Sequence, residues 1–115
     1  MKSRFPKYND GMLKVCTQEQ QAVDFAAPKN ARSQKDLRMI LKLAYEEKSK
    51  RDEDIEFAQS IGRSLSLKVK TRLHEKVDPA KKIMIEGKLY SILKIDHDRA
   101  NREMYIYLEE ERTIK

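Results

Sequence analysis

Residues 82–95 read KIMIEGKLYSILKI and residues 102–109 read REMYIYLE. In the first stretch, two apolar-rich runs flank the pair Glu86-Gly87, which is typical of a β-hairpin with a tight turn. In the second stretch, period-two alternation predicts a strand with Met104, Ile106 and Leu108 on one face and Tyr105 and Tyr107 on the other. This half of the chain therefore predicts a hairpin, a turn over the polar residues 96–101, and a closing strand.

The alternation continues toward the N-terminus. Residues 64–72 place Leu65, Leu67, Val69 and Thr71 on one face, against Lys68, Lys70 and Arg72 on the other, so we expect a strand with a basic outer face. Residues 38–46 predict a second strand that buries Met39, Leu41, Leu43 and Tyr45. A shorter strand over residues 12–16 would place Leu13 and Val15 on one face.

One short helix is expected over residues 50–61, between two of these strands. Ser49 and Asp52 have the spacing of a capping box, and Gly62 supplies the residue that can end the helix with a positive φ. Ile55, Ala58 and Ile61 recur at helical spacing. Five to six strands and one inserted helix predict a mainly β fold, a small antiparallel β-barrel or sandwich.

At 115 residues the chain has room for a single domain, residues 1–115. We expect a flexible N-terminal arm over residues 1–11. Residues 17–36 have no steady period and contain Pro28, so we expect a long loop there, which is either a contact element or plain disorder.

Composition narrows the function classes. One cysteine excludes an internal disulfide framework and fits a reducing compartment, and no apolar run is long enough to span a bilayer or serve as a signal peptide, so we expect a soluble protein. The net charge is +6, with the basic excess in the first 50 residues. Such an excess can contact nucleic acid, contact an acidic protein surface, or only solvate the chain.

Nothing in the sequence forms a motif for catalysis, a cofactor or a metal. The cluster Asp96-His97-Asp98 is more simply explained as a turn, and Cys16 as a packing residue. Three glycines are too few for a phosphate-binding loop. The acidic residues that open the expected helix are explained by the helix dipole. Tyr105 and Tyr107 are either an exposed contact pair or a second buried face.

The ordered set of strand RMILKLAYEE, helix RDEDIEFA, strand SLSLKVKTR, hairpin KIMIEGKLYSILKID and strand REMYIYLE covers about 70 of the 115 residues. It resembles the head-tail joining proteins of long-tailed bacteriophages, which are also called head closure, stopper or head-tail adaptor proteins. The resemblance implies a β-barrel subunit of the virion that is not an enzyme, joins the DNA-filled head to the tail, and helps close the portal channel.

The same resemblance implies the partners. We expect a homo-oligomeric ring in the virion, a dodecamer by family resemblance, between the portal or adaptor side and the tail side. In isolation we expect a monomer, made in the host bacterial cytoplasm, with no membrane partner. By position, Lys29, Arg32, Lys35 and Arg38 are the candidates for a channel or inter-subunit loop that contacts packaged DNA or acidic neighbours. The alternative is a small nucleic-acid-binding barrel that uses Lys68, Lys70 and Arg72, and a third hypothesis is an enzyme acting through His97 and Asp98.

Overall fold

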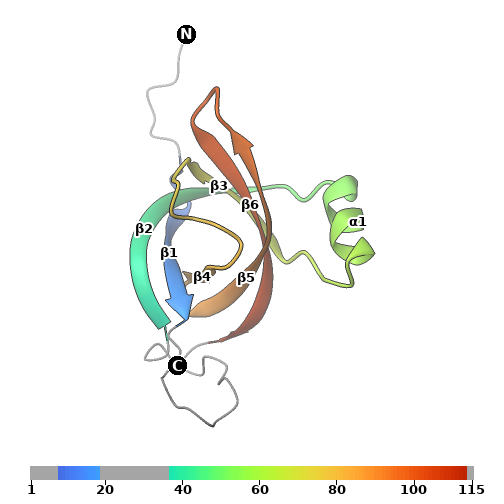
Figure 1. Cartoon of the computed structure of the whole chain (residues 1–115). Helices are drawn as coiled ribbons and strands as arrows, with labels where there is room; N and C mark the ends of the chain where they lie inside the picture. The colour runs from blue at the N-terminus through green and yellow to red at the C-terminus, as the bar shows by residue number, and fades with distance from the viewer. Residues whose placement is uncertain (1–7, 19–36, 114–115) are drawn as a thin grey trace.

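The computed structural model describes residues 8–113 except 19–36, and it forms a closed antiparallel barrel (Figure 1). Neighbouring strands follow the order β1-β2-β3-β6-β5-β4, and β4 returns to pair with β1. The elements are β1 (Gly11–Gln18), β2 (Leu37–Lys48), α1 (Asp52–Ser60), β3 (Leu67–Arg72), β4 (Lys82–Ile85), β5 (Lys88–Asp98) and β6 (Glu103–Thr113). The expectation of a small antiparallel barrel with one inserted helix is confirmed, and the sandwich is excluded.

The barrel interior holds the apolar faces that alternation predicted. Met104, Ile106 and Leu108 of β6 are fully buried, as are Leu13 and Val15 of β1 and Val69 of β3. Burying apolar surface stabilises a fold by about 25 cal/mol for each Å² removed from water, so these inward rows are the main source of stability. Closure of the sheet also gives every strand a paired neighbour on each side over part of its length.

The prediction that Met39 lies in the core is wrong. The β1–β2 register shifts between Val15 and Cys16: Val15 pairs with Leu41, whereas Cys16 pairs with Met39. Ile40 is therefore an extra residue, and the change of phase turns it toward the core while Met39 becomes 50% exposed. A bulge of this kind inverts the faces of all residues beyond it, which strict alternation cannot anticipate.

Helix α1 begins two residues later than the capping pattern suggested. The N-cap residue is Arg51, not Ser49, and the carboxylate of Asp54 accepts a hydrogen bond from the backbone N–H of Arg51 at 3.0 Å. Asp54 is thus the acidic member of the capping box. The end of the helix is as expected, because Gly62 follows with a φ of +72°.

The β4–β5 hairpin is as expected, whereas the β5–β6 hairpin is longer than expected. Glu86 and Gly87 connect β4 to β5 with φ values of +50° and +80°, which is the two-residue turn that was predicted. However, β5 continues through Asp98, so Asp96 and His97 belong to a strand, and the turn lies after Asp98. The β5–β6 hairpin consequently extends beyond the rest of the barrel (Figure 1).

In the described residues, no helix has the length and apolar content to span a membrane.

Candidate functional site

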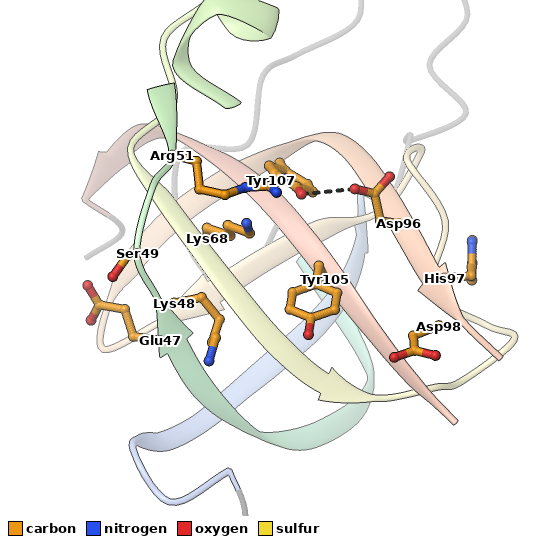
Figure 2. Close-up of a pocket in the computed structure, with 10 residues that line it drawn as sticks. All are labelled: Glu47, Lys48, Ser49, Arg51, Lys68, Asp96, His97, Asp98, Tyr105 and Tyr107. Carbon is orange, nitrogen blue, oxygen red and sulfur yellow. Dashed lines mark hydrogen bonds between the residues drawn. The ribbon is translucent and has the colours of Figure 1, made fainter. Parts of the chain in front are cut away.

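A groove of about 660 Å³ lies on the outer face of β2, β3, β5 and β6. We call it the tyrosine groove, because Tyr105 and Tyr107 of β6 lie at its centre (Figure 2). Its lining is made of Glu47, Lys48, Ser49, Arg51, Lys68, Asp96, His97, Asp98, Tyr105 and Tyr107. Charges of both signs surround the two aromatic rings, so the groove has no single electrostatic character.

A buried ion pair lies at the helix end of the tyrosine groove. The Nζ of Lys68 is 3.0 Å from Oδ2 of Asp54, and the two side chains are only 7% and 2% exposed. Arg51 also donates to the same carboxylate from Nε at 3.2 Å and Nη2 at 3.1 Å. Burial alone would raise the pKa of Asp54, but the hydrogen bonds from Arg51 and Lys68 outweigh burial and hold that pKa well below its usual range.

The aromatic rings are part of the same contact between helix and barrel. The Lys68 ammonium lies 5.6 Å from the ring centroid of Tyr105 and 5.2 Å from that of Tyr107. The Tyr107 hydroxyl donates to Asp96 at 2.9 Å, and both burial and that hydrogen bond raise the pKa of Tyr107. Lys94 lies 4.5 Å from the ring of Phe57 on α1. The contacts of Lys68 with Asp54 and of Lys94 with Phe57 attach α1 to β3 and β5, and Tyr107 of β6 lies against both lysines.

The predicted basic outer face on β3 is only partly exposed. The stripe does point away from the barrel core, but Lys68 is buried and paired with Asp54. Lys70 lies 3.3 Å from Glu46 and 3.8 Å from Glu103. Arg72 remains exposed at the strand end. The sequence of β3 alone does not show which of its outward-facing lysines are buried. The carboxylates that pair with them come from other elements, β2, α1 and β6.

The predicted loop residues cannot be placed in the same way. Lys29, Arg32 and Lys35 lie outside the described residues. Arg38 is the second residue of β2 and is exposed. The structure thus does not bring the members of this candidate set together at a described site.

The residues considered for chemistry have structural partners. Asp98 accepts hydrogen bonds from the backbone N–H and the side-chain amide of Asn101, which lower its pKa. Cys16 is 1% exposed, and burial raises the pKa of its thiol. It packs with Leu37, Met84 and Leu89 in a second apolar cluster. Across residues 8–18 and 37–113, no group of three or more His, Cys, Asp or Glu side chains could hold a metal ion.

A second surface was missed at the sequence level. Lys14 and Lys42 lie directly opposite each other on the outer side of β1 and β2, and Met12 and Met39 flank them with exposures of 52% and 50%. We call these four residues the Lys14–Lys42 face. Only the β1–β2 register reveals it, because the two strands are separated by the long segment 19–36.

No family model and no curated protein matches this sequence.

Proposed function

We propose that this chain is a structural virion subunit that joins the DNA-filled head of a long-tailed phage or prophage to its tail. In this role it forms a ring in the connector, helps close the portal channel and offers a docking surface for the tail. The order of elements supports the proposal most directly: a closed six-stranded barrel with one helix between its second and third strands has the arrangement on which the resemblance depends.

The surfaces of the barrel are compatible with assembly through faces and loops. Each strand already pairs with a neighbour on both sides over part of its length, which favours contacts through side chains and projecting turns. The β5–β6 hairpin projects beyond the barrel (Figure 1) and carries the exposed residues Arg99 and Arg102 at its tip. A projecting hairpin of this kind is suited to reach a portal, adaptor or tail protein, or packaged DNA.

The nucleic-acid-binding alternative receives less support from β3 than the sequence suggested. Phosphate binding by Lys68 would require breaking its buried pair with Asp54, and Lys70 is already close to two carboxylates. Measuring DNA affinity against salt concentration separates the two proposals. A binding constant that falls steeply with added salt, and that depends on Lys70 and Arg72, would favour the nucleic-acid-binding barrel.

We propose a role without catalysis, cofactor or metal. Of the candidate acid and base, Asp98 orders the hairpin turn through Asn101, whereas His97 lies exposed on the projecting part of β5. An enzyme acting through these residues predicts that His97→Ala abolishes a measurable turnover while the thermal unfolding temperature stays the same. That outcome would contradict the connector proposal.

The decisive experiment deletes the gene from the phage or prophage genome that carries it and examines the particles by electron microscopy. We expect heads without tails, either filled with DNA or emptied. Supplying the wild-type chain should restore tailed virions. Val69→Asp, which places a charge in the fully buried core, should fail, whereas Arg99→Ala at an exposed position tests whether the hairpin tip takes part. Normal tailed virions after deletion would refute the proposal.

A further inference from the structure

Two lysines meet directly across the strand pair on the Lys14–Lys42 face. Residues directly opposite on antiparallel strands have Cβ atoms about 4.5–5.5 Å apart, and like charges in this arrangement destabilise the pair. Within the described part of the chain, neither ammonium has a carboxylate at ion-pair distance, in contrast to Lys68, Lys70 and Lys82. The fold therefore tolerates a local repulsion here that an anionic partner would relieve.

The flanking methionines give the Lys14–Lys42 face an apolar component. Met12 and Met39 are two of the three large hydrophobic side chains that are exposed in the described residues. Methionine is flexible and adapts to irregular partner surfaces. The expected occupant thus combines carboxylates with an exposed apolar side chain.

Helix α1 of the same chain has these properties. Asp52, Glu53 and Glu56 are exposed along its outer side, and we call them the acidic stripe, while Asp54 and Ala58 are buried toward the barrel. Residues four apart on a helix have Cβ atoms about 5–6 Å apart, close to the separation of two opposed strand residues. The third exposed hydrophobic side chain, Ile61 at 49%, lies at the end of this helix.

The two surfaces lie on opposite sides of the molecule. In the barrel order, β1 and β2 are across from β5 and β6, and α1 contacts β3 and β5 through Lys68 and Lys94 (Figure 1). The acidic stripe cannot reach the Lys14–Lys42 face of its own chain. When one surface of a subunit meets the other surface of the next, the contact is heterologous and continues until it closes into a ring or forms a filament.

We propose that the Lys14–Lys42 face binds helix α1 of a second copy of this chain, with Lys14 and Lys42 opposite Asp52 and Glu56. This contact would join neighbouring subunits of the ring in the proposed function. Only closure of the contacts into a ring rests on that proposed function. The contact itself is a property of the purified chain, which we expect to be a monomer when it is dilute. Because it is small and its charges are exposed, it forms in a concentrated solution and weakens with salt.

The test uses two double variants of the full chain, Lys14→Glu/Lys42→Glu and Asp52→Lys/Glu56→Lys. Self-association is measured by sedimentation velocity from about 10 µM to about 1 mM protein, at about 50 mM and about 500 mM salt. The wild type should associate at low salt, and each variant alone should lose at least about tenfold in affinity. Mixing the two variants should restore association, because the glutamates on the strand face of one variant then lie opposite the lysines on the helix of the other.

A matched control for the lysine variant, Lys76→Glu/Lys88→Glu, lowers the net charge by the same amount at exposed positions elsewhere and should leave association unchanged. Thermal unfolding of every variant shows whether the barrel is intact. A wild type that stays monomeric throughout, or a mixture that does not associate, overturns the proposal. So does a lysine variant that loses DNA affinity while it still self-associates. If the contact between copies is confirmed but deletion of the gene still gives normal virions, only the proposed function is refuted.

Discussion

Removing the carboxylate of Asp54 should be among the most damaging single changes outside the apolar core. Asp54→Ala leaves the ammonium of Lys68, whose side chain is 7% exposed, without its counter-charge, and it also removes the acceptor for the backbone N–H of Arg51. Breaking a buried ion pair from one side costs about 3–5 kcal/mol. At about 4 °C per kcal/mol for a domain near this size, the midpoint of thermal unfolding should fall by roughly 12–20 °C.

The matched control for this change is Asp52→Ala. Asp52 lies in the same first helical turn but is exposed, so it contributes only through the helix dipole, by about 0.3–1 kcal/mol. A double-mutant cycle with Lys68→Met isolates the pair. We expect a coupling of about 2 kcal/mol in urea denaturation, with the double variant more stable than the sum of its parts predicts. Equal losses for Asp54→Ala and Asp52→Ala would refute the buried-pair reasoning.

The ion pair also predicts the sign of a pH effect. In the folded protein the pKa of Asp54 lies well below its value of about 3.9 in an unfolded chain. The unfolded chain therefore takes up the proton first, so the stabilisation is complete above about pH 5 and declines as the pH falls toward the folded pKa. The stability difference between wild type and Asp54→Asn should accordingly shrink on acidification below about pH 5.

Three further changes have clear expected outcomes. Tyr107→Phe removes the hydrogen bond to Asp96 and should lower the free energy of unfolding by about 1 kcal/mol in urea denaturation. Glu86→Asn should raise it by about 0.5 kcal/mol, since asparagine adopts the positive φ of this hairpin turn more readily than glutamate. Cys16 should react slowly with a thiol reagent in the native protein and rapidly in denaturant, because its thiol is buried with a raised pKa; equal rates would contradict its placement.

Several elements were predictable because their signals are local. The alternation of residues 104–108, the turn at Glu86-Gly87 and the helix end at Gly62 all depend on residues within a few positions of one another. The candidate surfaces were less predictable. The charged residues of β3 were visible in the sequence, but their partners Asp54 and Glu103 lie 14 or more residues away, so an expected exposed stripe proved to be largely paired.

The sequence by itself determined which faces of the strands are apolar, where the β4–β5 hairpin turns and where the one helix lies. Only the tertiary structure decided that β3 pairs with β6 and β1 with β4, that a bulge exposes Met39, that Lys68 is buried against Asp54, and that Lys14 lies opposite Lys42. Side-chain period and turn preference are set by local backbone geometry. Strand register and the pairing of charges depend on segments far apart in the chain, whose relative positions are set only when the barrel closes.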